Sequence, residues 1–218
     1  MAATQEISNR TSLFLNESNQ MEGIHEIDYA DPTFQDPSKG HFGAFTLSQE
    51  AARNRAPLSV KILRTWQALL GKEQKERSGD HIGDQEIGHI RGPSLQKNVR
   101  IGKHIPPQYE RVPALIQCWV EDLNEDLAKN HETYARSDKA FANFAGSQFL
   151  RFEKIHPFGD GNGRMGRLIA NYISTYCNRP LLVFPSEYSM RNRYIEAHDS
   201  EEAMASYFSK RMAEVAAF

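Results

Sequence analysis

The sequence has few cysteines and no long hydrophobic run. Its 218 residues contain two cysteines, Cys118 and Cys177, each within an apolar stretch with helical spacing. These cysteines favour buried free thiols over a disulfide framework or a metal site. No stretch approaches the roughly 20 apolar residues of a membrane-spanning helix, and the amino-terminal segment lacks a basic stretch followed by an apolar core. We therefore expect a cytoplasmic protein with no membrane contact.

An excess of charge of either sign is also lacking. The 26 basic and 28 acidic side chains leave a formal charge of −2, which provides no global attraction to nucleic acid or to acidic membranes. We therefore expect no nucleic-acid partner, and any phosphate site must be local. Repeats and low-complexity segments are absent, and the composition of 39% apolar and 25% charged residues is typical of a globular protein.

The spacing of apolar residues predicts an all-α protein. Asp28–Phe45, rich in Pro, Gly and Asp, is expected to be a connecting loop, and Gly88–Gly102, with short β-prone pieces, is expected to form a small hairpin. We divide the chain into residues 1–45, a helix with its connecting loop, and residues 46–218, the main domain. Helical spacing covers residues 4–22, 47–55, 58–77, 108–130, 138–155, 163–177, 187–198 and 201–216.

Residues 156–167, His-Pro-Phe-Gly-Asp-Gly-Asn-Gly-Arg-Met-Gly-Arg, concentrate the chemically useful groups of the chain. Pro157 disfavours the α conformation at the residue before it, so the preceding helix should end at His156. An imidazole that titrates near neutrality can act as a general base toward a hydroxyl. The alternative is that His156 only caps the helix carbonyls. Phe158 is interpreted as an anchor that pins the loop to the core.

The middle of this motif has the composition of an anion site. Gly161 and Gly163 let the backbone approach a ligand, and the helix that follows presents free N–H groups and its positive dipole end. Asp160 supplies a hard oxygen ligand of the kind that Mg²⁺ shares with phosphates and water. The alternative is an ordinary helix start with Asp160 or Asn162 as its cap.

The helix after the loop has two distinct sides. Arg164, Arg167 and Asn171 lie on one side, so the arginines are expected to be free to face solvent or a ligand. Two arginines one turn apart beside an anion site favour contacts to a triphosphate. The opposite side is an apolar stripe that we assign to the core: Met165, Leu168, Ile169, Tyr172, Ile173 and Tyr176.

The pattern H-P-F-x-D-G-N-G-R-x-x-R resembles the signature of the Fic family, whose members mostly transfer AMP from ATP to a hydroxyl of a target protein. The resemblance implies a Fic-type helical bundle with a small β-hairpin flap, with ATP as substrate and Mg²⁺ as cofactor. It assigns His156 as the base, Asp160 as the Mg²⁺ ligand, Asn162 as a phosphate contact, and Arg164 and Arg167 as the phosphate grip. Of the two arginines, Arg167 is expected to hold the terminal phosphate.

The segment Ser18–Gly23 resembles the inhibitory motif of the same family, [S/T]-x-x-x-E-[G/N]. A helix over residues 4–22 would place Glu22 on its inward side, where a carboxylate needs a cation. The resemblance supplies Arg167 as that cation, which predicts a self-inhibited enzyme, and it suggests removal of AMP as a second role for Glu22. The alternative is that Gly23 simply terminates the helix and that Ser18 and Glu22 are an exposed pair one turn apart. The inward side comprises Ile7, Thr11, Phe14, Leu15, Ser18, Met21 and Glu22.

Two further regions are assigned by resemblance. The flap would add a target segment by main-chain pairing and present its hydroxyl to His156, whereas the plain alternative is a loop closed by two short strands. Three residues near the carboxyl-terminal end of the chain are assigned by resemblance to the surroundings of the adenine, with purely structural roles as the alternative. The aromatic residues Phe141, Phe144 and Phe149 are assigned to the core. The flap residues are Val99, Arg100, Ile101 and Gly102, and the adenine residues are Arg193, Tyr194 and His198.

The leading interpretation is therefore a Mg²⁺-dependent protein adenylyltransferase. Its partners would be ATP and a target protein, or a copy of itself, with an accessible Ser, Thr or Tyr hydroxyl. The alternatives are transfer of another phosphate-containing group on the same scaffold, or a catalytically silent regulator that binds nucleotide. The sequence leaves homo-oligomerisation open.

Overall fold

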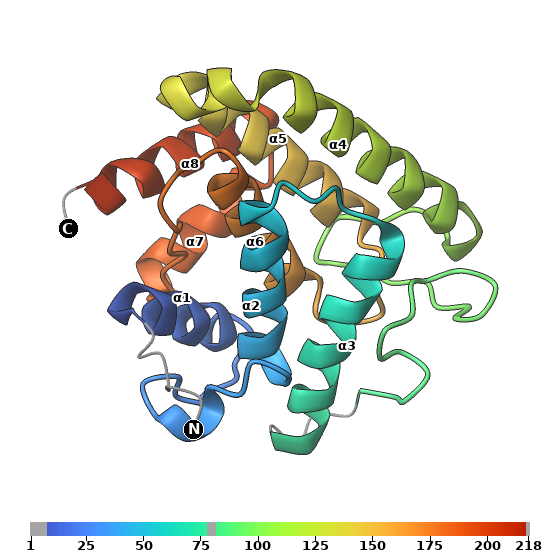
Figure 1. Cartoon of the computed structure of the whole chain (residues 1–218). Coiled ribbons are helices and arrows are strands. Elements are labelled where there is room, and N and C mark those ends of the chain that lie inside the picture. Colours follow the sequence, from blue (N-terminus) through green and yellow to red (C-terminus); the bar gives the residue numbers. More distant parts are fainter. Residues whose placement is uncertain (1–7, 78–81, 217–218) are drawn as a thin grey trace.

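The computed structural model describes residues 8–77 and 82–216, and the regular secondary structure in that part of the chain is helical, with long loops between several helices (Figure 1). The all-α prediction is confirmed. None of the described helices is long and apolar enough to cross a membrane. The α-helices are α1 (Asn9–Gln20), α2 (Gly40–Arg53), α3 (Val60–Arg77), α4 (Val112–Arg136), α5 (Asp138–Ile155), α6 (Asn162–Tyr176), α7 (Tyr188–Ala197) and α8 (Glu201–Ala216); two single 3₁₀ turns are Pro32–Phe34 and Tyr109–Arg111.

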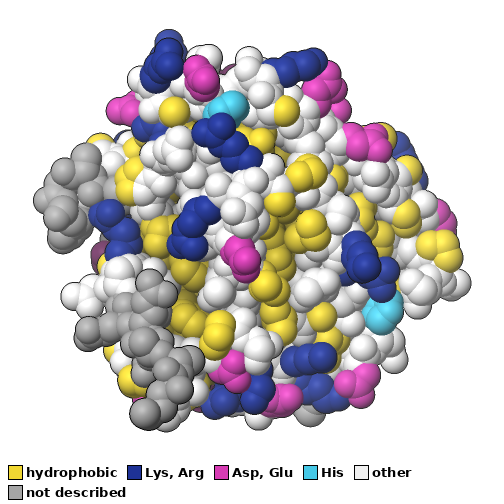
Figure 2. All heavy atoms as spheres, viewed as in Figure 1, with side chains coloured by type: hydrophobic (Ala, Val, Ile, Leu, Met, Phe, Trp, Pro, Cys, Tyr) yellow, Lys and Arg dark blue, Asp and Glu magenta, His cyan; other side chains and the backbone are white. Residues whose placement is uncertain are grey.

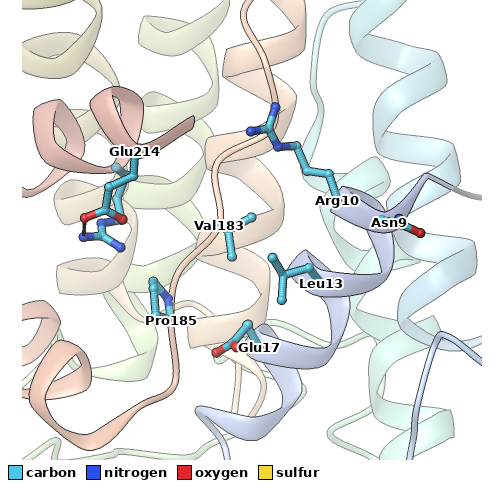
Figure 3. Close-up of a pocket in the computed structure, with 8 residues that line it drawn as sticks. Asn9, Arg10, Leu13, Glu17, Val183, Pro185 and Glu214 are labelled. Atoms are coloured by element: carbon cyan, nitrogen blue, oxygen red, sulfur yellow. Dashed lines mark hydrogen bonds and ion pairs between the residues drawn. The ribbon is translucent and has the colours of Figure 1, made fainter. Parts of the chain in front are cut away.

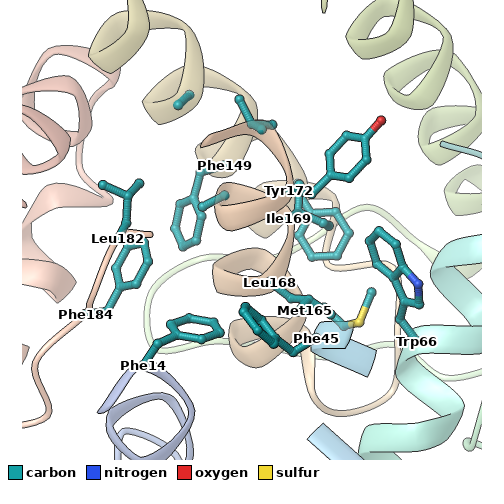
Figure 4. Close-up of a cluster of buried hydrophobic side chains, with 14 of the residues drawn as sticks. Phe14, Phe45, Trp66, Phe149, Met165, Leu168, Ile169, Tyr172, Leu182 and Phe184 are labelled. Atoms are coloured by element: carbon teal, nitrogen blue, oxygen red, sulfur yellow. The ribbon is translucent and has the colours of Figure 1, made fainter. Parts of the chain in front are cut away.

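Helix α6 lies at the centre of the fold and packs against α1, α2, α3, α4 and α5. Phe14 of α1, Phe45 of α2, Trp66 of α3 and Phe149 of α5 all reach toward it (Figure 4). The predicted apolar stripe of α6 is buried, as are Phe141, Phe144 and Phe149.

The other side of α6 does not face solvent, which was one of the two environments expected for its arginines, and Arg167 instead lines a cavity. Arg164, Arg167 and Asn171 are all buried, because α1 and α2 cover this side of the helix. The Asn171 amide pairs with the backbone N–H and C=O of Leu182 at 2.7 and 3.0 Å. Both arginine head groups must therefore find partners inside the protein.

The observed helix bounds agree best with the predictions where the capping residue is adjacent to the helix in the sequence. The predicted limits of α5 and α8 are those observed, and Ser137 caps α5 by accepting from the backbone N–H of Ala140. Helix α1 begins after the cap Ser8 and ends at Gln20, so Glu22 lies just beyond it. The predicted residues 4–7, including Ile7 of the inward side, lie outside the described residues.

Helix α2 begins at Gly40 rather than at position 47, so the loop predicted to reach Phe45 is shorter, and the boundary between residues 45 and 46 falls inside a helix. The early start of α2 is caused by a residue of α3, far along the chain. The Glu73 carboxylate accepts from the backbone N–H of His41 at 2.9 Å and satisfies one of the free donors of this helix start. A Cβ at Gly40, where φ is +59°, would overlap the same carboxylate.

The predicted hairpin is absent from the described residues. Isolated bridges join Gly92 to Leu95 and Ile101 to His104, without a continuous ladder. The backbone of this segment pairs with the motif loop instead, because the N–H of Arg91 donates to the C=O of Pro157 at 2.7 Å. Two tight turns therefore take the place of the expected flap strands.

The two cysteines differ in environment. Cys177 is buried where α6 ends, as predicted, whereas Cys118 is exposed on α4. Ile116, Trp119 and Val120 occupy the inward side of α4, which leaves Cys118 on the outer side. The surface in Figure 2 intersperses acidic and basic side chains, in keeping with the small net charge.

Close packing of α5 on α8 gives a prediction for stability. A Cβ on Gly146 would lie 3.1 Å from the backbone N of Ala205, so Gly146→Leu must push the two helices apart. We expect the free energy of unfolding in urea to fall by about 1–3 kcal/mol. Exposed Asn143 on the same helix is the control, and Asn143→Leu should change this free energy by less than about 0.5 kcal/mol. Equal effects of both substitutions would contradict the packing described.

Candidate active site

A cavity of ≈ 770 Å³ opens beside the motif and is lined by segments distant in sequence. His156 at the end of α5, Gly163 and Arg167 on α6, and Glu22 beyond α1 all contribute to its wall. Residues 101–104 and part of α7 complete it. The structure therefore brings together the predicted base, Gly163 of the predicted anion site at residues 160–163 (the anion loop) and the predicted inhibitory residue Glu22, whereas Asp160, Gly161, Asn162 and Arg164 are not among the lining residues.

His156 both ends α5 and faces this cavity. Its backbone is left-handed, with φ 50° and ψ 63°, and its N–H donates to the C=O of Phe152 at 2.9 Å. Its carbonyl accepts from Nε of the fully buried Arg91 at 2.8 Å. Burial lowers the pKa of the imidazole to about 4, and the positive charges of Arg91 and His104 add to this effect. A neutral imidazole at neutral pH is free to accept a proton.

The anion loop is shaped by its glycines and by the Asn162 side chain. Gly161, at φ +78°, precedes α6, and a Cβ on Gly163 would overlap the Glu22 carboxylate. Asn162 accepts from the N–H of Phe158 at 2.9 Å and donates to its C=O at 3.0 Å. These two hydrogen bonds hold the loop in a fixed conformation. Phe158 is buried, as predicted for a residue that anchors the loop to the core. The expected phosphate contact of Asn162 is then left to its backbone N–H, in the first turn of α6.

Helix α3 holds Asp160 in place. Asp160 Oδ2 accepts from Gln74 Nε2 at 3.1 Å, and Oδ1 accepts from the backbone N–H of Gly161 at 2.5 Å. Gln67 Nε2 donates to the Asp160 carbonyl at 3.3 Å. The other end of the Gln74 amide accepts from the buried Arg164 guanidinium. The acid and the arginine of the motif are thereby fixed relative to each other.

The donor set fits Mg²⁺ that is shared with a nucleotide. No cluster of three or more His, Cys, Asp or Glu side chains that could hold a metal occurs in the described part of the chain. Asp160 instead offers one carboxylate beside glycine-lined N–H groups. Mg²⁺ is commonly bound in this way, with phosphate oxygens and water completing its coordination.

Arg167 forms the ion pair predicted with Glu22. Only 1% of its side chain is exposed, and Nη2 lies 2.6 Å from Glu22 Oε1. Nε donates to Ser18 Oγ at 2.9 Å, and Nη2 donates to the Ser18 carbonyl at 2.8 Å. Nη1 lies 3.4 Å from the Tyr194 hydroxyl. The last turn of α1 and the residues after it thus satisfy this buried cation.

The predicted helical position of Glu22 suggested an inward side chain, but in the structure Glu22 does not lie in the core. The structure leaves 36% of its side chain exposed, because α1 ends at Gln20 and the carboxylate lies at the cavity wall. Desolvation raises the pKa of Glu22, but the pairing with Arg167 and the charges of Arg164 and Arg191 outweigh it, so the pKa is lowered overall. Glu22 is therefore ionised at neutral pH.

The expected target and adenine residues are only partly brought to the cavity. Ile101 and Gly102 line its mouth, whereas Val99 and Arg100 are not among the lining residues. The Arg100 side chain turns back to the carbonyl of Gly102 at 3.1 Å.

Of the three residues assigned to the adenine, two lie at the cavity. Tyr194 and His198 line the cavity. Arg193 is exposed and contacts Met190 instead, while Arg191, two residues earlier on α7, lines the cavity. An offset of two residues on a helix changes the facing by about 200°.

Several residues of this site were missed from the sequence. Arg91 ties the end of α5 to the loop before α4, because it donates to the carbonyls of Ile155 and Pro107 at 2.9 Å each. Gln74 links Asp160 to Arg164, and Glu153 lines the cavity one turn before His156. None of these has a local sequence signal, since each acts through a partner that the fold supplies.

A second cavity of ≈ 630 Å³ lies apart from this chemistry, between α1, α8 and residues 183–185 (Figure 3). Leu13, Val183 and Pro185 give it an apolar wall, and Arg211 and Glu214 pair at its edge. It contains no residue of the 156–167 motif, so the candidate active site is the cavity beside His156.

The environment of His156 gives a pH prediction. Because burial disfavours the imidazolium, we expect the ring to titrate with a midpoint of about 4 in proton NMR. The folded state binds this proton less readily than the unfolded chain, so the associated stability is lost as pH falls from 6.5 toward about 4. The imidazole resonance that disappears in the His156→Gln variant is the resonance of His156. A midpoint near an ordinary value of about 6.5 would contradict the burial described.

Comparisons with known proteins agree with this geometry. The model of the Fic/DOC family matches residues 57–174, more than half of the 218 residues. The Protein adenylyltransferase Fic of Drosophila erecta is 31% identical over 140 residues, which cover 64% of this chain and 25% of the relative. The protein of the same name from Drosophila willistoni is 29% identical over 112 residues, or 50% and 20%. The chain thus spans about a quarter or less of these relatives.

Solved structures show the same fold at lower identity. A Fic domain containing signalling protein from Bacteroides thetaiotaomicron has a TM-score of 0.69 and 17% identity, covering 94% of this chain and 85% of that one. Fic-1 from C. elegans has a TM-score of 0.63 and 17% identity, covering 98% and 63%. The family match, the curated relatives and the shared helical fold lead to one conclusion: the chain belongs to the Fic/DOC family.

Proposed function

We propose that the protein is a Mg²⁺-dependent protein adenylyltransferase that uses ATP. The observation that carries the proposal is the convergence of His156, the glycine-lined start of α6 and Arg167 on one cavity. The names of the curated relatives, Protein adenylyltransferase Fic, support the same activity. The partners would be ATP and a protein hydroxyl of Ser, Thr or Tyr, including one on a second copy of this chain.

The proposed reaction is a single displacement at the α-phosphorus. His156 takes the proton of the target hydroxyl, whose oxygen forms a bond to the α-phosphorus while the bond to the pyrophosphate oxygen breaks. Arg164, Arg167 and the N–H groups at the start of α6 would hold the phosphates. Asp160 would hold Mg²⁺, which would supply positive charge near the phosphates. Positioning and charge stabilisation would supply most of the rate enhancement.

We further propose that α1 and the residues after it, up to the start of α2, carry an inhibitory element, or brake, of a catalytic domain that begins with α2. The supporting contact is the pair of Glu22 with Arg167, the residue expected to hold the terminal phosphate. A γ-phosphate cannot take its place on Arg167 while the carboxylate occupies it, because two anions would then compete for one cation. The partial exposure of Glu22 at the cavity wall also suits a role in orienting water to remove AMP.

Removal of Glu22 should therefore release the activity. We expect Glu22→Gly to incorporate label from the α-phosphate of ATP into protein at least about 10-fold faster than the unsubstituted chain. His156→Ala in the same background should abolish the incorporation, and the exposed Glu26→Gly is the matched control. Label from the γ-phosphate alone would indicate phosphoryl transfer. No label from either phosphate, in a variant that still melts cooperatively, would contradict the proposal.

A further inference from the structure

Glu153 is a buried carboxyl that the mechanism above does not use. It lies on α5 one turn before His156 and lines the same cavity. Its side chain is 10% exposed, and among the described residues its Oε1 is buried without a hydrogen-bond partner. Buried carboxyl oxygens normally have such partners, because leaving one unpaired is costly.

A complementary unsatisfied atom lies opposite this carboxyl. Nδ1 of His156 is also buried without a hydrogen-bond partner, and it lies 3.9 Å from Glu153 Oε2. A ring nitrogen that carries hydrogen is a donor and a carboxylate oxygen is an acceptor. An approach of about 1 Å would bring the two atoms to hydrogen-bond distance.

The packing of α5 on α6 builds a place for this carboxyl. A Cβ on Gly166 would overlap Glu153 Oε1 and would lie 2.9 Å from Cε2 of Phe149. Glu153 therefore fills the space that glycine leaves at this helix crossing. Any larger residue at position 166 would displace the carboxyl from His156.

We propose that Glu153 is a positioning residue that accepts the Nδ1–H of His156 and so keeps Nε2 unprotonated and facing the target hydroxyl. The inference rests on the proposed function of His156 as the base. When His156 deprotonates the target hydroxyl, one proton moves, from the hydroxyl oxygen to Nε2. Glu153 forms no covalent bond, retains its own protonation state and stabilises the imidazolium that results.

The charges around Glu153 make the arrangement sensitive to pH. Burial raises the pKa of Glu153 to about 8, although Arg167 of α6 opposes this rise, and Glu22, beyond α1, adds to it. Burial and the charge of Glu153 both raise the pKa of Tyr194 of α7, and His156 itself stays neutral above its pKa of about 4. The ionised acceptor therefore becomes more populated as pH rises toward 8, and the rate should rise with it.

The test uses the full chain with Glu22→Gly, to which Glu153→Gln or Glu153→Leu is added. Leucine removes the acceptor, and we expect kcat to fall about 10- to 100-fold with little change in the KM for ATP. Glutamine keeps an acceptor oxygen without charge, so it should lose less activity but abolish the rise of rate with pH. Glu196→Gln, at an exposed site on α7, is the control that should change neither quantity.

A second readout needs no turnover. Nitrogen-15 NMR of His156 without nucleotide should show mainly the Nδ1–H tautomer, and Glu153→Leu should shift the population toward Nε2–H. Unchanged kcat, pH profile and tautomer in the glutamine and leucine variants would overturn the proposal, as would a rise in KM alone. If Glu22→Gly transfers no α-label, the proposed function fails, and the tautomer measurement still decides the role of Glu153. If the leucine variant does not fold, the pH profile of the glutamine variant is the deciding readout, and a rise of rate with pH that persists in that variant would overturn the proposal.

Discussion

The structure depends on satisfying one buried cation, the guanidinium of Arg167. An arginine with 1% of its side chain exposed cannot remain unpaired, because removing one partner of a buried ion pair typically costs about 3–5 kcal/mol. In the structure described, Ser18 and Glu22 supply its partners, and this pairing secures the end of α1 against α6. A triphosphate is the other anion that the cavity could offer to the same group. Under the proposed function, the Glu22 carboxylate and the terminal phosphate of ATP would therefore be alternatives at one site.

The motif supplies the chemistry, but residues far from it fix the geometry. Arg91 holds the carbonyls at the end of α5, so the backbone that carries His156 cannot drift. Gln74 joins Asp160 to Arg164 from α3, and Glu153 stands behind the imidazole. Preorganisation of this kind lets a small set of groups act without rearranging during the reaction.

The sequence predicted those parts of the fold that have local causes. Pro157 forces α5 to end at His156, and Ser137 caps the other end, so this helix was placed correctly. The ion pair of Glu22 with Arg167 was predicted from the resemblance of two short motifs. The candidate base and the ion pair beside it can therefore be found from two short segments of the sequence.

The parts that were missed depend on distant contacts. Helix α2 starts early because Glu73 caps its first turn, and the hairpin is replaced by turns because Arg91 pairs with the motif loop. Glu153 resembles an ordinary polar residue of a helix, and only the packing against Gly166 shows that it is buried beside the base. Burial of Arg164 and Arg167 likewise follows from the covering helices, which the spacing along α6 cannot show.

The shared use of Arg167 is tested most directly by the dissociation constants of ATP and ADP, measured by calorimetry with Mg²⁺. The measurements would use chains with His156→Ala, to prevent turnover, with and without Glu22→Gly. If Glu22 occupies the place of the terminal phosphate, its removal should tighten ATP binding by about 10-fold, or about 1.4 kcal/mol, and leave ADP binding nearly unchanged. Equal changes for both nucleotides, or no change for ATP, would contradict competition at Arg167.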